Sequence, residues 1–288
     1  MTAESNKKIR KNRPAFAARV LLIGILLLLA GSVWAGQSKN TVDFLTVWSG
    51  MLPIILAAPH GGRVSLSLIP PRRGVGVAQF IAKRDNNTAE LAEAIGVKIN
   101  ERLGSRPFLV VARFERRYLD ANRPAFDAFE SAAAKPYYDA YHGAIELAVQ
   151  RIRNRWGAGL LLDIHGQGSE PDTIFRGTDN GKSVAALRQR HGSAALTGSE
   201  SILGQLAAKG YKIIPNTAGD ERERRYTGGY TTRTYGSHHG TCIDAIQLEL
   251  GANLRSQKNL PRTADDLAEA AANFARAFLA SNPMPANP

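Results

Sequence analysis

Two histidines that follow apolar runs, and one carboxylate inside a third run, are the residues best suited to chemistry in this chain. His60 follows a run that ends at Ala58, His165 ends another run, and Glu249 lies within the strand-like segment 243–251. Imidazole nitrogens and carboxylate oxygens are ligands that zinc accepts, and a catalytic zinc usually keeps three protein ligands and one open position. These residues predict a zinc hydrolase site if the fold brings them together.

The third metal ligand is expected to be a carboxylate, and Asp85 is the first choice because it follows the His60 loop and precedes a predicted helix. Glu90 and Asp163 are the alternatives, and Asp85 could instead only cap the N-terminus of that helix. Residues two apart in a strand point to the same face. Asp163 is therefore also placed to orient His165 and fix its tautomer.

Glu249 is the predicted catalytic residue. A carboxylate inside an apolar strand is costly unless it has a cation, a metal or a raised pKa. Beside a zinc ion and its water, Glu249 would act first as general base and then as general acid toward the leaving amine. A buried ion pair with an arginine is the alternative.

A polar loop supplies candidates for binding a substrate carboxylate. Arg117, Asn122 and Arg123 lie close together in the sequence, and arginine offers a planar fork that matches a carboxylate. Tyr230, which follows Gly228 and Gly229, is expected to line a mobile loop over the site. The alternatives are an ordinary surface loop for the first group and simple packing for the tyrosine.

Strand-like and helix-like segments alternate along the chain, which predicts an α/β fold with a mostly parallel sheet. We expect strands near 53–58, 107–113, 160–165, 173–175 and 211–215, and helices near 88–95, 136–156, 199–209 and 264–279. In such sheets, ligands bind beyond the carboxyl ends of the strands. His60 and His165 are therefore expected to meet at that edge.

The first 36 residues have the order of an export signal. A basic stretch precedes the apolar run 20–30, and small residues then flank Trp34. We predict a cleaved signal peptide or an uncleaved membrane tether through residues 15–34, and thus a periplasmic or extracellular protein, free or held at the inner membrane. The predicted domain plan is signal or anchor 1–36, linker 37–52, catalytic domain 53–280 and disordered tail 281–288.

The chain has 288 residues and a formal net charge of +12. Without the first 36 residues the charge is roughly +7, which suits an anionic substrate, an anionic envelope surface or a solvated face. No long Lys/Arg block interleaved with aromatic residues follows, so nucleic-acid binding is not expected. Cys242 is the single cysteine, and an intramolecular disulfide is therefore excluded.

Together these segments resemble the N-formylglutamate amidohydrolase family over about residues 53–252. The matching pieces are 59–62, Asp85 with Thr88, Arg117 with 120–124, 138–142, 163–166, 226–230 with 235–236, and 247–249. The resemblance implies a zinc-dependent hydrolase with the three-layer α/β/α fold and mixed, mostly parallel sheet of the zinc carboxypeptidases.

In that family pattern His60 and His165 look like metal ligands, Glu249 like the general base, and Asn122 with Arg123 like the pair that grips a carboxylate. Zinc carboxypeptidases place a glutamate three residues after the first histidine, but here that position is Arg63. This departure moves the third ligand to Asp85.

The sequence thus predicts an exported, zinc-dependent amidohydrolase that cleaves an amide bond in a carboxylate-bearing acyl-amino acid or small peptide. The predicted location favours exported acyl-amino acids or wall peptides over formylglutamate. A non-catalytic ligand-binding envelope protein on the same fold is the alternative.

Overall fold

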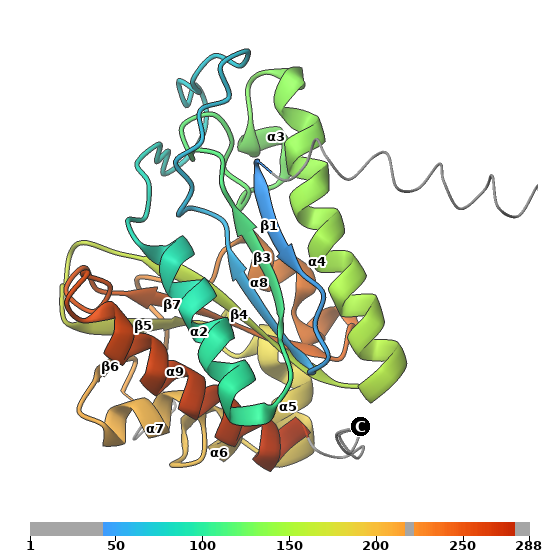
Figure 1. Ribbon diagram of the computed structural model, residues 1–288, viewed down its shortest axis with the longest axis vertical. Coiled ribbons are helices and arrows are strands. Elements are labelled where there is room, and N and C mark those ends of the chain that lie inside the picture. The colour runs from blue at the N-terminus through green and yellow to red at the C-terminus, as the bar shows by residue number, and fades with distance from the viewer. Residues whose placement is uncertain (1–42, 217–221, 280–288) are drawn as a thin grey trace, which may run out of the picture. The chain divides into compact units, whose positions relative to one another are not determined.

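The computed structural model describes residues 43–216 and 222–279, which build a seven-stranded sheet with helices on both faces (Figure 1). The strands are β1 (Leu45–Trp48), β2 (Ile54–Ala58), β3 (Phe108–Ala112), β4 (Gly159–Gly166), β5 (Thr173–Gly177), β6 (Lys212–Ile214) and β7 (Ile243–Leu250). Their order across the sheet is β1-β3-β2-β4-β7-β5-β6. The α/β fold and the strands expected from the sequence are therefore present.

The centre of the sheet is parallel and its flanks are mixed. Strands β3, β2, β4 and β7 run parallel to one another, whereas β1 pairs antiparallel with β3 and β5 pairs antiparallel with β7. The parallel strands β2, β3 and β4 are almost wholly apolar because helices cover both of their faces. Their carboxyl ends share one edge, which is where ligands bind in sheets of this kind.

Helices form the two outer layers. The main helices are α2 (Thr88–Leu103), α4 (Lys135–Trp156), α7 (Ile202–Ala208) and α9 (Leu260–Phe274). Shorter helical segments are α3 (Ala125–Ala128), α5 (Ala185–His191), α6 (Ala194–Thr197), α8 (Tyr230–Tyr235), the 3-10 turns at Ala132–Ala134, Lys182–Val184 and Ser237–His239, and a π-helical turn at Ala275–Leu279.

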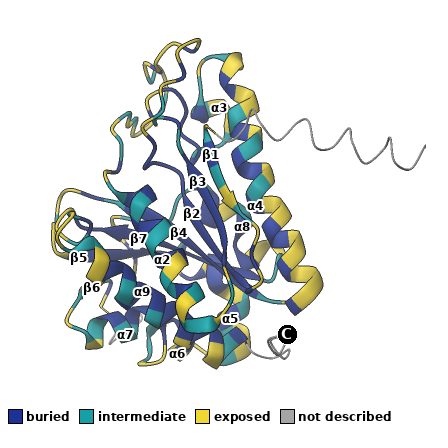
Figure 2. Cartoon of the chain, viewed as in Figure 1, coloured by how far each residue is buried: buried dark blue, intermediate teal, exposed yellow. Residues whose placement is uncertain are grey.

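Alternate residues of each central strand enter two separate apolar cores. In β2, Ile54 and Leu56 pack with α2, α7 and α9, whereas Ile55 and Ala57 pack with α4. Figure 2 shows the resulting pattern of buried strands between helices that are buried on their inner sides only. This arrangement gives the three layers that the family resemblance implies.

Helix α2 begins directly after the loop that carries Asp85. Its cap residue is Asn87, whose backbone is left-handed at φ 63° and whose side chain makes no capping hydrogen bond. Asp85 does not cap the helix with its side chain either: its backbone carbonyl accepts a hydrogen bond from Thr88 Oγ1. The Asp85 carboxylate is therefore left available for the site.

Strand β1 lies within the segment 37–52, which the sequence predicts to be a linker or entry segment, and it extends the sheet at one edge. The predicted signal or anchor 1–36 and the predicted tail 281–288 lie outside the described residues. Among the helices of the described residues, none combines the length and the apolar character needed to span a bilayer.

Candidate active site

The candidate site lies at the carboxyl edge of the parallel strands. His60 follows the end of β2, His165 is near the end of β4, and Glu249 is near the end of β7. His165 and Glu249 are paired in register on neighbouring strands. The loop before α2 adds Asp85, whose backbone N–H donates to the carbonyl of His60 at 3.1 Å.

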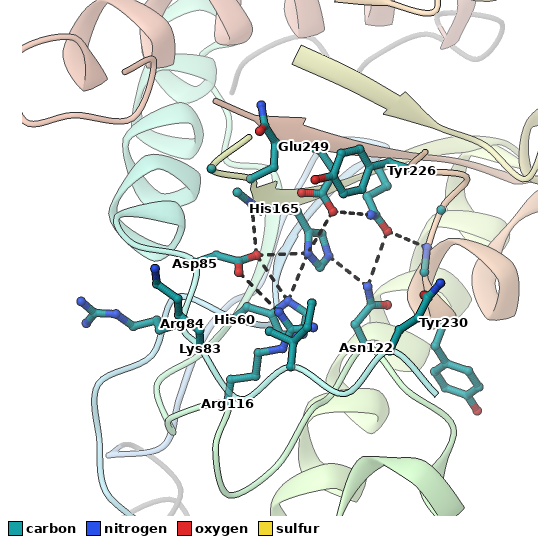
Figure 3. A pocket seen from close by; sticks show the side chains of 18 of the residues that line it. His60, Lys83, Arg84, Asp85, Arg116, Asn122, His165, Tyr226, Tyr230 and Glu249 are labelled. Carbon is teal, nitrogen blue, oxygen red and sulfur yellow. Dashed lines mark hydrogen bonds and ion pairs between the residues drawn. The ribbon is translucent and has the colours of Figure 1, made fainter. Parts of the chain in front are cut away.

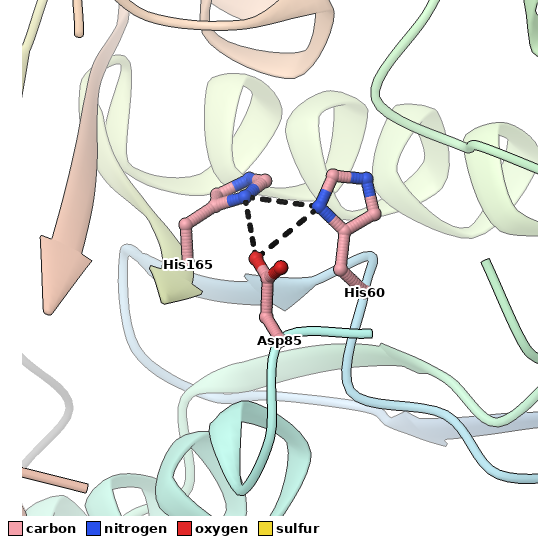
Figure 4. A group of neighbouring side chains, drawn as sticks. All are labelled: His60, Asp85 and His165. Carbon is pink, nitrogen blue, oxygen red and sulfur yellow. Dashed lines mark hydrogen bonds and ion pairs between the residues drawn. The ribbon is translucent and has the colours of Figure 1, made fainter. Parts of the chain in front are cut away.

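His60, Asp85 and His165 converge on one point (Figure 4). The two Nδ1 atoms lie 3.1 Å apart, and each lies 3.4 Å from Oδ2 of Asp85. All three side chains are buried. Two ligands of a tetrahedral zinc, each bound at about 2.0–2.1 Å, lie about 3.3 Å apart. The observed separations fit that donor set, and the structure brings together the three ligands predicted from the sequence.

The other nitrogen of each histidine faces a carboxylate. Nε2 of His60 lies 2.6 Å from Oδ1 of Asp120, and Nε2 of His165 lies 3.0 Å from Oδ2 of Asp163. With a metal bound, Nε2 would carry the proton in both rings, and both Nδ1 lone pairs would point at the same place. Two lone pairs and a carboxylate oxygen this close repel one another unless a cation lies between them.

Electrostatics support the same conclusion. Burial opposes a charge on His165, but Asp163, Asp85 and Glu249 together raise the pKa of His165 well above its usual value. Burial also opposes ionisation of Asp85, yet hydrogen bonds from His165 and His60 hold its pKa well below the usual range. The carboxylates around the two rings thus favour positive charge at this point, whether it is carried by a protonated imidazole or by a metal ion that replaces the proton.

Arg116 pairs with two carboxylates of this cluster, those of Asp120 and Asp85. It is buried, its Nε donates to Oδ2 of Asp120 at 2.9 Å, and its Nη1 lies 3.4 Å from Oδ1 of Asp85. Burial opposes ionisation of Asp120, but His60, Arg116 and Arg72 lower its pKa. The cluster is therefore a network of paired charges rather than an isolated buried acid.

Glu249 lies beside the cluster, with Oε1 3.9 Å from Nδ1 of His165. Burial raises the pKa of Glu249, Asp85 adds to the rise and His165 opposes it. Oε1 accepts a hydrogen bond from Nε2 of Gln247 at 2.8 Å, while Oε1 of Gln247 accepts from the backbone N–H of Gly229 at 2.6 Å. Since a backbone N–H can only donate, these contacts fix the orientation of the Gln247 amide and direct its NH₂ at Glu249.

A cavity of about 940 Å³ opens over these residues (Figure 3). Apart from Asp85 and Glu249, its charged lining is cationic: Lys83, Arg84, Arg116, Arg123, Arg225, Arg233 and Arg255. The volume is within the usual range for a small-molecule site. The lining favours an anionic ligand.

The structure separates the predicted carboxylate-binding residues. Arg123 and Asn122 line the cavity, but Arg117 does not, because its exposed side chain pairs with Glu115 at 2.7 Å. A contact of Arg117 with substrate stays a prediction, and the buried neighbour Arg116 lies in the cavity wall.

Asn122 and Tyr230 have structural contacts as well as a place in the cavity lining. Oδ1 of Asn122 accepts from the backbone N–H of Thr231 at 2.8 Å, and its Nδ2 lies 3.1 Å from Nε2 of His165. The Tyr230 ring packs edge-on against His142, and Figure 3 shows it turned away from the three ligands. Substrate contacts of these two residues remain predictions.

The two alternative ligands have other partners. Glu90 forms an ion pair with Arg63 at 3.3 Å, and Asp163 lies behind His165. Arg63, which stands where zinc carboxypeptidases have a glutamate, therefore points to a neighbouring acid.

Sequence reasoning missed four residues of the site: Arg116, Asp120, Gln247 and Tyr226. The first two lie in an irregular loop, where no periodicity shows which side chains turn inward. Gln247 could have been found, because it lies two residues before Glu249 in a strand and must share its face. Tyr226 packs on Phe175, which is paired in register with Glu249, and lies on the Glu249 side of the cavity in Figure 3.

Comparisons of the sequence with known proteins find similarity to N-formylglutamate hydrolases. The family model for N-formylglutamate amidohydrolase matches residues 128–254. An N-formylglutamate deformylase from Pseudomonas putida is 26% identical over 263 residues, which covers 78% of this chain and 90% of that protein.

Two crystal structures share the fold. An N-formylglutamate amidohydrolase from Ralstonia eutropha superposes with a TM-score of 0.54 at 17% identity, covering 82% of this chain and 98% of that one. A gene product from Agrobacterium tumefaciens superposes with a TM-score of 0.56 at 15% identity, covering 83% and 96%. The chain is thus similar in sequence to N-formylglutamate amidohydrolases, through the family-model match and the related deformylase, and it shares the fold of the two crystal structures.

Proposed function

We propose that this chain is a zinc-dependent amidohydrolase that cleaves the amide bond of an N-acyl amino acid carrying a free carboxylate, of the N-formylglutamate type. The observation that carries the proposal is the convergence of His60 Nδ1, His165 Nδ1 and Asp85 Oδ2, with Glu249 beside them. The names of the P. putida and R. eutropha relatives support the substrate class.

The residues of the chain have distinct parts in this reaction. His60, Asp85 and His165 would hold the metal, which supplies a Lewis acid that polarises the scissile carbonyl and lowers the pKa of water to about 7. Arg123, whose guanidinium lines the cavity and is partly exposed, binds the substrate carboxylate.

Glu249 moves the proton. Its Oε1 accepts from Gln247, so Oε2, which accepts no hydrogen bond from the described residues, takes a proton from the attacking water. The same oxygen then gives that proton to the leaving nitrogen as the C–N bond breaks, which yields a carboxylic acid and an amine. Burial raises the pKa of Glu249, and this favours its role as the general acid that protonates the leaving nitrogen.

The test combines metal analysis with a substrate panel. We expect about one zinc per wild-type chain, and turnover of N-formylglutamate or another acyl-amino acid. Glu249→Gln should keep the metal and lose about a thousandfold or more in kcat, since general acid–base groups contribute roughly 10²–10⁴. Arg123→Ala should raise KM for carboxylate substrates but not for their amides. Zinc-free wild-type protein after reconstitution, or Glu249→Gln with normal kcat, would contradict the proposal.

We propose further that the chain is exported, either free after cleavage or tethered through residues 15–34. The support is the order of basic, apolar and small residues in the first 36 positions. Intact-mass measurement of the protein from fractionated cells tests this: a periplasmic mature form, or the full-length chain in the membrane fraction, is expected. Full-length chain in the soluble cytoplasm would contradict it.

A further inference from the structure

Arg255 is a buried arginine in the loop after β7, and the reaction outlined above gives it no part. Its side chain is 6% exposed and lines the wall of the cavity. Among the described residues it forms no ion pair within 4.0 Å. A buried guanidinium must satisfy its five N–H donors in some other way.

Three backbone carbonyls, from three separate segments, accept these donors. Nε donates to Leu250 at 3.0 Å, Nη2 donates to Gln167 at 3.0 Å, and Nη1 donates to Asn86. The segments are the end of β7, the end of β4 and the loop before α2.

Each acceptor lies within two residues of a group that the reaction needs. Leu250 follows Glu249, Gln167 comes two residues after His165, and Asn86 follows Asp85. One rigid planar group therefore ties together the three backbone segments that carry the base and two of the metal ligands. His60 is the one ligand whose segment Arg255 does not contact.

The guanidinium of Arg255 is packed so closely between β4 and the loop after β7 that its position is fixed. A Cβ at Gly166 would lie 2.4 Å from Cζ of Arg255, so only glycine leaves room for the guanidinium beside β4. The backbone N–H of the same Gly166 donates to Oδ2 of Asp85 at 3.1 Å. Nδ2 of Asn87 donates to the carbonyl of Arg255 at 2.8 Å and holds the loop from the other side.

We propose that Arg255 is a positioning residue that sets the spacing of Asp85, His165 and Glu249 without touching any of the reacting atoms. This inference rests on the proposed metal site. Arg255 acts through the backbone of Asn86, Gln167 and Leu250, so its loss moves a ligand and the base away from each other rather than removing either.

The test uses Arg255→Lys and Gly166→Ala. Arg255→Lys keeps the charge but loses the planar, five-donor guanidinium. Gly166→Ala leaves the arginine at position 255 unchanged, but the added Cβ pushes its guanidinium away from β4. Arg102→Lys is the matched control, because Arg102 also donates to a backbone carbonyl, that of Lys98, but at the far end of α2. The readouts are the zinc dissociation constant by chelator competition, kcat and KM, and the Tm of the metal-free protein.

We expect both test variants to weaken zinc binding by about tenfold or more, the range seen when groups that orient metal ligands are removed. They should lower kcat by a similar factor and leave KM nearly unchanged, because Arg123 and the rest of the cavity wall stay in place. The control should match wild type in all three readouts.

Three results would overturn the inference. If Arg255→Lys and Gly166→Ala bind zinc and turn over substrate like wild type, Arg255 does not position the site, while the proposed function stands. If neither variant folds without metal, Arg255 holds the fold rather than the site. If wild type itself binds no zinc and cleaves nothing, the proposed function fails and this inference fails with it.

Discussion

At the scale of single residues, the orientation of the two histidine ligands depends on carboxylates that do not reach the metal position. Asp120 and Asp163 each accept from the Nε2 of one histidine. Without such a partner the ring can rotate, and Nδ1 can take the proton instead of the metal.

Asp120→Asn and Asp163→Asn should therefore each weaken metal affinity by about 10–100-fold, while the ligands themselves remain. Chelator competition on the folded proteins measures this effect. Asp139→Asn is the control, because Asp139 is exposed and, within the part of the chain that the structure describes, forms an ion pair with Lys135 alone, on the surface of α4. Unchanged affinity in both test variants would show that the carboxylates do not orient the rings.

His142 gives a second residue-scale prediction, on stability rather than catalysis. Its Nδ1 faces the hydroxyl of Tyr235 and its Nε2 faces the carbonyl of Ala121, so it joins α4 and α8 to the loop that carries Asn122. Burial lowers the pKa of His142 from 6.5 to about 4. The folded protein therefore holds this ring neutral at a pH where the unfolded chain protonates it.

The sign follows from proton linkage. Between pH 6.5 and about 4 the unfolded state binds the extra proton, so the contribution of His142 is complete above pH 6.5 and is lost as the pH falls toward 4. The full loss is about 3 kcal/mol in the free energy of unfolding. His142→Gln should flatten the pH dependence of unfolding measured in urea over that range, whereas His239→Gln, at an exposed position, should not. An identical slope in His142→Gln and wild type would refute this.

At the scale of elements, α2 links the first core to the site, because it begins just after Asp85 and packs its apolar face under the sheet. Ile95 is fully buried there, ten residues from Asp85. Ile95→Ala should lower the free energy of unfolding by about 2–5 kcal/mol and leave the zinc stoichiometry of the folded protein unchanged. Val97→Ala, on the exposed face, should cost less than about 0.5 kcal/mol. Urea titration of both variants measures the difference.

Regular elements were predictable because their buried faces require apolar residues at regular spacing in the sequence. The apolar runs of β2, β3 and β4 and the helical spacing of α4 all lie where the sequence places them. Strand β1 was not predicted because it is a short edge strand with alternating exposure, and the residues around it show no other secondary-structure pattern. The antiparallel direction of β5 also leaves no mark in the sequence, since the same side chains suit either direction.

The site residues likewise include some that the sequence predicts and some that it does not. His60, His165 and Glu249 were predictable because strand ends and an acid in an apolar run are visible in the sequence, and Asp85 followed from its place before a helix. Arg116 and Arg117 could not be told apart, because neighbouring arginines in an irregular loop give no clue to which one turns inward. Only the fold shows that Arg116 faces the cavity and Arg117 faces solvent.

At the scale of the whole molecule, the two candidate histidine ligands lie 105 residues apart in the sequence, with Asp85 between them, so the unfolded chain does not hold the three ligands together. Zinc should therefore bind the folded state and raise the Tm. At a free zinc concentration of a thousand times the dissociation constant, linkage gives about 4 kcal/mol. For a domain of this size that corresponds to roughly 8–16 °C. The double variant His60→Ala/His165→Ala should show no shift; a wild-type Tm that ignores zinc would argue against the site.

The cationic wall of the cavity also has a kinetic consequence. The cavity that an anionic substrate must enter is lined by Lys83, Arg84, Arg123, Arg225 and Arg233. Long-range attraction of this kind speeds diffusional encounter, and it fades as the ionic strength rises and the screening length falls below about 8 Å. For anionic substrates, kcat/KM should thus decline with added salt while kcat stays constant; a neutral amide analogue should show no such decline. Electrostatic attraction would then increase the association rate of an anionic substrate, and that rate would depend on the salt concentration around the protein.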